Sequence, residues 1–114
     1  MITRFPGLTP TRSRAVVHDG LVFTVAVSPD GKAGFYEQTV KALRRIDESL
    51  AMSGTDKGHI LSALVFIADI ARKEDMNRAW DEWVDRDNPP MRACLGVDLE
   101  PPHLVEIVVT AAQR

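Results

Sequence analysis

The spacing of hydrophobic and polar positions changes several times along the chain, and each spacing predicts an element. Near the start, β-branched and apolar residues fill Arg14 to His18 and Leu21 to Ser28. Asp19-Gly20 lies between these runs, and such a pair between two runs is a strong signal for a β-hairpin. Ser28 to Lys32 has the composition of a turn, so the second strand should end there.

From Phe35 to Met52 the apolar residues recur every three or four positions, which predicts one long amphipathic helix. Its apolar stripe consists of Tyr36, Val40, Leu43, Ile46 and Leu50. Gly54 occupies the place where a helix C-cap belongs. Arg44 and Arg45 fall on the polar side of this helix, where we expect them to be solvated.

The run from Ile60 to Ala68 is almost continuously apolar, and its Val, Ile and Phe content predicts a buried central strand. A second helix follows, and its apolar stripe consists of Met76, Trp80, Trp83 and Val84. Asn88-Pro-Pro90 ends this helix, because proline cannot continue one. Two more strands are predicted at about Arg92 to Val97 and Leu104 to Ala111.

The predicted order of elements is ββαβαββ, which indicates an α+β fold with a mixed sheet and two helices packed on one face. The length of 114 residues is that of a single domain, so we expect residues 1–114 to form one. Helices on one face leave the other face of the sheet open. Because a domain of this size buries a limited share of its surface, a second subunit is the natural cover.

Composition narrows the class of protein. The formal net charge is −2, which argues against a nucleic-acid binder that acts by neutralising phosphates. The single cysteine, Cys94, excludes an intrachain disulfide and favours a reducing, cytoplasmic location. No apolar run approaches the roughly 18 residues of a membrane span. The first residues also lack the apolar core of a signal peptide.

Two charges in the last quarter of the chain need an explanation, because an unpaired buried charge is costly. Arg92 begins one apolar run and shares a strand face with Cys94, two residues on. Glu106 interrupts the other run. If the two strands lie close together, Arg92 and Glu106 open onto a common cavity. The alternative is that each charge lies on an exposed strand face or a sheet edge, where charges prevent aggregation.

Other chemical signals are weaker. His18, His59 and His103 are scattered without ligand spacing, so no metal site is predicted. No phosphate-binding loop and no nucleophile arrangement is present, and no cofactor is expected. Arg12 clusters with Arg4 and Arg14 near the N-terminus, either as a solvated face or facing an anionic ligand. Cys94 is either a core residue or a thiol whose anion Arg92 stabilises.

Two motifs give a resemblance to a known family. Pro90-Met-Arg92-Ala-Cys94, followed by Leu104-Val-Glu106-Ile107 and an ending of small residues, resembles the Rid/YjgF family, also called endoribonuclease L-PSP. Farther upstream, Ala15 to Phe23 is similar to the first hairpin of the family, and Leu64 to Asp69 to its central strand. Glu37-Gln38-Thr39 and Asp75-Met-Asn77 are similar to its two helix starts. The resemblance covers nearly the whole chain.

The resemblance implies a chorismate-mutase-like fold and a homotrimer with one cleft at each subunit interface. It also implies hydrolysis of reactive enamines and imines to 2-oxo acids and ammonia. Arg92 matches the arginine that binds the substrate carboxylate, and Cys94 matches the cysteine beside it. Glu106 matches the glutamate that positions a water. A guanidinium suits a carboxylate because its parallel N–H groups donate bidentately.

The chain departs from the family pattern at the expected pocket wall. Arg12 stands where deaminating members carry a tyrosine, and Val25-Ala26-Val27 stands where they read Ser-Gly-Gln. Ala26 keeps the N–H that approaches the substrate carboxylate but adds a methyl group. The readings are therefore an imine deaminase or a non-catalytic, carboxylate-binding regulatory trimer. An endoribonuclease or translation inhibitor is a third reading, against which the net charge argues.

Overall fold

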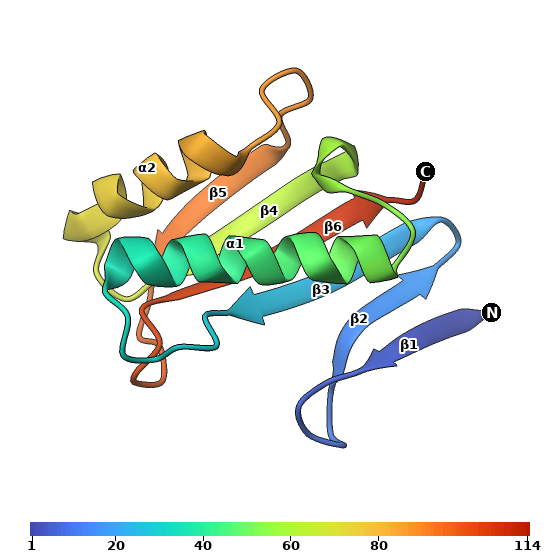
Figure 1. The fold of residues 1–114 in the computed structure, drawn as a ribbon, viewed down its shortest axis with the longest axis horizontal. Coiled ribbons are helices and arrows are strands. Elements are labelled where there is room, and N and C mark those ends of the chain that lie inside the picture. Colours follow the sequence, from blue (N-terminus) through green and yellow to red (C-terminus); the bar gives the residue numbers. More distant parts are fainter.

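Six strands form one mixed sheet, and two helices lie across one of its faces (Figure 1). The computed structural model describes all 114 residues. The strands are β1 (Ile2–Pro6), β2 (Ser13–His18), β3 (Leu21–Val27), β4 (Ile60–Ile67), β5 (Met91–Gly96) and β6 (Val105–Ala112). The helices are α1 (Phe35–Met52) and α2 (Lys73–Trp83), with short 3-10 helices at Lys57–His59 (η1) and Ile70–Arg72 (η2). The predicted α+β class is confirmed.

The order of strands in the sheet differs from their order in the chain. It runs β1-β2-β3-β6-β4-β5, so the last strand lies in the middle and β5 lies at one edge. Only β4 and β5 pair in parallel, because α2 connects them across the helical face. The hairpin between β2 and β3 is confirmed. Asp19 and Gly20 turn it with φ of 50° and 77°, the left-handed conformation that an Asp-Gly turn adopts.

The structure contains one strand that the pattern did not predict. β1 pairs antiparallel with β2 and forms the other edge of the sheet. Its residues are almost all exposed, so burial imposes no alternation on them. Pro6 ends it, which fits an edge strand because proline has no N–H to donate. β1 and β2 form an arm that extends beyond α1 (Figure 1).

The hydrophobic core lies between the sheet and the two helices. α1 has the predicted bounds, and Leu43, Ile46 and Leu50 on its stripe are fully buried. The buried face of α1 also includes polar residues that the stripe did not contain. Gln38 is the clearest case, because its side chain donates to the carbonyls of Ala33 and Pro102 and accepts from the N–H of Leu104. This amide therefore ties the start of α1 to the segment before β6.

The end of α1 has the predicted glycine. Gly54 has a φ of 80°, and its N–H donates to the carbonyl of Ala51. The next N–H, that of Thr55, donates to the carbonyl of Leu50. This pair of bonds is a Schellman motif with Gly54 at its left-handed position.

A polar contact joins the two helices. Trp83 Nε1 of α2 donates to Asp47 Oδ2 of α1 at 3.0 Å, and Lys57 Nζ lies 5.4 Å from the centre of the Trp83 ring. Burial raises the pKa of Asp47, while the Trp83 hydrogen bond and the Lys57 charge lower it less. Neither helix is long and apolar enough to cross a membrane.

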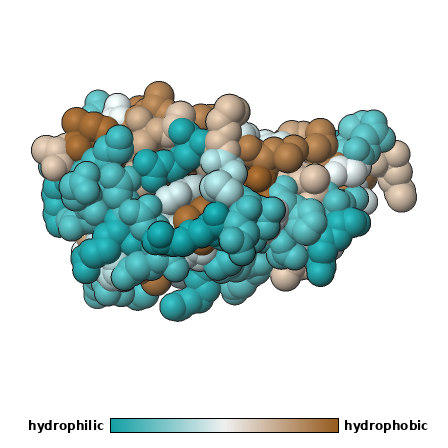
Figure 2. All heavy atoms as spheres, turned by 90° about the horizontal axis from the view of Figure 1, so that it is seen from above, coloured by the Kyte–Doolittle hydropathy of each residue, from teal (hydrophilic) through white to brown (hydrophobic).

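The face of the sheet opposite the helices is uncovered and apolar. Phe23, Val25, Leu64 and Leu95 are each about two-fifths exposed on their strands. On β6 the side chains at alternate positions are fully buried, and those between them are only half-buried. Figure 2 shows the resulting contrast, with hydrophobic atoms along one side of the molecule and hydrophilic atoms along the other. Exposed apolar area of this kind marks an interaction surface.

Candidate functional site

Arg92 lies on the edge strand β5, under the start of α2. Its partner on β4 is Ala63, which is buried on the helical side of the sheet. Arg92 Nη2 donates to Asn77 Oδ1 at 3.0 Å, and Nη1 lies 3.7 Å from Met76 Sδ. The guanidinium carbon lies 5.3 Å from the centre of the Trp80 ring, within cation–π range. Three residues of α2 therefore hold this guanidinium in one place.

Arg92 has no acidic partner in the chain, although α2 holds it firmly. Cys94 lies on the same strand face, as predicted, because its partner on β4 is Val65. The Cys94 thiol is half-buried and packs against the hydrophobic core. The two residues are thus neighbours, with Arg92 fixed and unpaired and Cys94 beside it.

Glu106 lies on the uncovered face of an interior strand. Its neighbours across the sheet are Val27 on β3 and Phe66 on β4. Val105 and Ile107 on either side of it are fully buried on the helical side, so the predicted facing of β6 is confirmed. The Glu106 side chain is half-buried and takes part in no salt bridge. Of the two alternatives for these charges, the sheet edge fits Arg92, whereas the strand face fits Glu106, because β6 is not an edge.

Glu106 lines a cleft of about 360 Å³ at one end of the sheet. The cleft is formed by the β1–β2 connection, the ends of β2 and β3, and the segment between β5 and β6. It contains two further predicted site residues, Arg12 and Ala26. The Ala26 side chain is 6% exposed and belongs to the core, so its backbone is what it offers to a ligand. The volume lies within the usual range for small-molecule sites.

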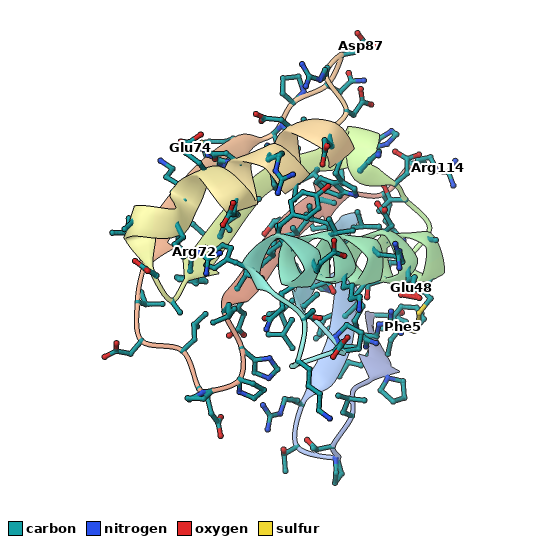
Figure 3. The ribbon with its side chains drawn as sticks, turned by 60° about the vertical axis from the view of Figure 1, so that its left-hand side comes forward. Phe5, Glu48, Arg72, Glu74, Asp87 and Arg114 are labelled. Carbon is teal, nitrogen blue, oxygen red and sulfur yellow. The ribbon has the colours of Figure 1, made fainter.

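The cleft also contains charged residues that the sequence did not assign to it. Arg14 Nε donates to Ser49 Oγ of α1 at 2.8 Å. Figure 3 shows Glu48 on the side of α1 toward the β1–β2 arm, where its Oε1 lies 3.8 Å from Arg14 Nη2. Arg45 lines the cleft one helical turn before Ser49 and is half-buried.

Glu100 and His103 enter the cleft from the segment between β5 and β6. From the sequence, His103 was only one of three scattered histidines. His103 Nδ1 is buried without a hydrogen-bond partner. No group of three or more His, Cys, Asp or Glu side chains lies close enough to hold a metal ion.

The predicted site residues therefore form two groups in one chain. Arg12, Ala26 and Glu106 share the cleft, whereas Arg92 and Cys94 lie on β5 toward α2. Strand β4 separates β5 from β6, and Arg92 and Glu106 project from opposite faces of the sheet. The common cavity expected from the nearness of the two strands does not form within a single chain. A site that uses both charges needs residues from two copies.

The sequence of this chain is similar to a known protein family and to several of its members. A model of the family "Endoribonuclease L-PSP" matches residues 10–113. A RutC family protein of Haemophilus ducreyi is 43% identical over 114 residues, which span 98% of this chain and 97% of that protein. The RutC family protein YoaB of Escherichia coli is 36% identical over 101 residues, covering 88% of this chain and 89% of the other.

Solved structures agree with the sequence comparison. The crystal structure of a YjgF family member from Neisseria meningitidis superposes with a TM-score of 0.93 at 39% identity. That match covers 100% of this chain and 96% of the other. A yeast protein, Mmf1, has the same fold at 20% identity, with a TM-score of 0.90.

Proposed function

The chain belongs to the Rid/YjgF family, also called endoribonuclease L-PSP, and on that premise we propose that it hydrolyses 2-enamine and 2-imine carboxylates to 2-oxo acids and ammonia. The observation that carries the proposal is Arg92, a guanidinium that Asn77, Met76 and Trp80 hold without any acidic partner. Such a group offers its free N–H donors as a fixed fork, which suits a carboxylate. Cys94 lies beside that anchor.

The reaction needs a water and the transfer of a proton. The water oxygen bonds to the carbon of the C=N group, and the nitrogen takes up a proton. The C–N bond of the resulting carbinolamine then breaks, which releases ammonia and leaves a 2-oxo acid, without any oxidation or reduction. We assign the orientation and deprotonation of the water to Glu106, a carboxylate on the cleft wall with no competing ion pair.

Assembly would bring the two halves of this site together. We propose a homotrimer in which the uncovered apolar face is buried between copies, with one cleft at each interface. Arg92 and Cys94 of one copy then face Glu106, Arg12 and the Ala26 backbone of the next. The separation of Arg92 from Glu106 within one chain supports this arrangement, because neither charge has an ion-pair partner in its own chain.

A second candidate is a trimer that binds a small carboxylate without turnover. The observation that favours it is the surroundings of Glu106, whose neighbours across the sheet are the apolar Val27 and Phe66. A water at Glu106 would therefore lack help from polar side chains at these two positions. This candidate keeps Arg92 as the anchor and removes only the chemical step.

Semicarbazide trapping separates the two candidates. An amino-acid oxidase releases an imine, semicarbazide traps it, and a hydrolase lowers the amount that is trapped. We expect the wild type to lower it and Glu106→Gln to lose about 10²–10⁴-fold in rate, the usual effect of losing a general base. Glu106→Gln should still bind 2-oxobutanoate in calorimetry. Binding by both proteins with no turnover by either would replace the enzyme by the non-catalytic trimer.

A further inference from the structure

The cleft around Glu106 contains more positive charge than one carboxylate requires. Arg12 and Arg45 both line it, and neither forms a salt bridge within the chain. Neither side chain takes part in a hydrogen bond within the chain either, in contrast to Arg14 of the same cleft. Both guanidinium groups are therefore available to a ligand.

Arg14 adds a third cation whose position is fixed. Its bond to Ser49 anchors it to α1, and Glu48 lies too far away, at 3.8 Å, for a hydrogen bond. Arg14 Nη2 is accordingly buried without a hydrogen-bond partner. Glu48 balances the charge of Arg14, so Arg12 and Arg45 are the cleft arginines without an ion-pair partner. In the proposed assembly, Arg92 of the neighbouring copy adds a further cation.

We propose that the substrate of this site carries a second anionic group and is a dicarboxylate 2-imine of four or five carbons. This inference rests on the proposed function, in which Arg92 holds the carboxylate beside the imine carbon. Arg12 and Arg45 then bind the distal carboxylate and determine specificity. A carboxylate that binds these two arginines gains charge-assisted hydrogen bonds from them.

The replaced tyrosine of the pocket wall fits this assignment. By the family resemblance, Arg12 takes the position of a tyrosine, and an arginine there replaces an aromatic wall with a carboxylate-binding group. Val25 and Val27 also line the cleft, and their apolar side chains suit the methylene groups between two carboxylates. The lining therefore combines arginines with apolar side chains.

Two 2-oxo acids with the same carbon chain test the inference. 2-Oxoglutarate has a distal carboxylate, and 2-oxopentanoate has a methyl group in its place. We expect calorimetry on the wild type to give about 10- to 100-fold tighter binding of 2-oxoglutarate, the effect of a hydrogen-bonded charge. Arg12→Gln and Arg45→Gln should each reduce this preference, because they should weaken 2-oxoglutarate binding more than 2-oxopentanoate binding. Arg44→Gln is the matched control, because Arg44 does not line the cleft.

The outcomes distinguish this inference from the proposed function. Equal binding of the two acids, with Glu106-dependent turnover of a monocarboxylate imine, would overturn the dicarboxylate assignment and leave the deaminase intact. A preference for 2-oxoglutarate that survives both Arg12→Gln and Arg45→Gln would overturn the role of these arginines. Failure to bind either acid, with no imine turnover, would overturn the proposed function itself.

Discussion

Single residues carry the chemical argument, and Arg92 is the most constrained of them. Asn77 accepts a hydrogen bond from its guanidinium, and the Trp80 ring lies within cation–π range of that group. No carboxylate of the chain forms a salt bridge with it. A charge that is held but unpaired favours a ligand over a structural role, because a structural ion pair would require an acidic neighbour. Glu106 also lacks an ion-pair partner, but no residue of the chain holds its carboxylate in place.

The Arg92 anchor predicts that lysine cannot replace arginine. Arg92→Lys keeps the charge but loses the planar fork, so it cannot bind a carboxylate through two parallel N–H groups. We expect Arg92→Lys and Arg92→Ala to weaken 2-oxobutanoate binding similarly, by about 10- to 100-fold. Calorimetry measures this, and thermal unfolding should show that both variants fold. Wild-type affinity in Arg92→Ala would exclude the role, and a collapse in its melting temperature would indicate a structural ion pair across the assembly.

Sequence reasoning found these residues but not their surroundings. The strand period correctly placed Arg92 with Cys94, and Glu106 opposite Val105 and Ile107. It could not tell that β4 lies between their strands, because strand order depends on long-range pairing and not on local spacing. Asn77, which holds Arg92, belonged to the Asp75-Met-Asn77 stretch of the family resemblance, but nothing in the sequence predicted its contact with Arg92.

Among the elements, α1 was predicted to the residue, because its apolar period and its glycine stop agree. β1 was missed because an exposed edge strand has no buried face to impose alternation. The burial of Gln38 was also missed. Two of its hydrogen-bond partners, Pro102 and Leu104, come from the segment before β6, more than sixty residues away. Local patterns thus predict elements, while polar residues that join distant segments need the tertiary structure.

The glycine that ends α1 should resist substitution. Gly54 has a φ of 80°, and an added Cβ would meet only Gln113 Nε2 at an ordinary 3.5 Å. The cost is therefore conformational, and we expect Gly54→Ala to lose about 1 kcal/mol of unfolding free energy. Gly54→Asn should lose less, because asparagine tolerates the left-handed conformation. Denaturant unfolding measures both, and a wild-type midpoint for Gly54→Ala would mean that the helix end relaxes.

The contact between α1 and α2 gives a pH-dependent prediction. Burial raises the pKa of Asp47 in the folded chain, so folding favours its protonated form and stability from this group falls as pH rises. Asp47→Asn keeps an oxygen for Trp83 Nε1 and removes the charge. We expect Asp47→Asn to melt at the wild-type temperature or higher at neutral pH, with the difference vanishing below the ordinary pKa of 3.8.

Asp81→Asn, an exposed position on α2, serves as the control for this comparison. It should leave the melting temperature unchanged at both pH values. A clear loss of stability in Asp47→Asn at neutral pH would show that the charged bond to Trp83 and the attraction to Lys57 outweigh the cost of burial.

At the scale of the whole molecule, the helices cover one face of the sheet and leave an apolar face open. One assembly would bury this apolar face and also bring Arg92 of one copy to Glu106 of the next. Light scattering should accordingly give a mass three times that of the 12.6 kDa chain. A monomer at micromolar concentration would remove the basis for a shared site.

Mixed trimers test the shared site most directly. Arg92→Ala and Glu106→Gln should each be inactive in the imine trap, because each lacks one half of every cleft. If the two halves come from different copies, co-refolding equal amounts should restore about a quarter of wild-type turnover, since about one cleft in four then combines an intact Arg92 with an intact Glu106. No recovery from confirmed mixed trimers would contradict a site built from two chains.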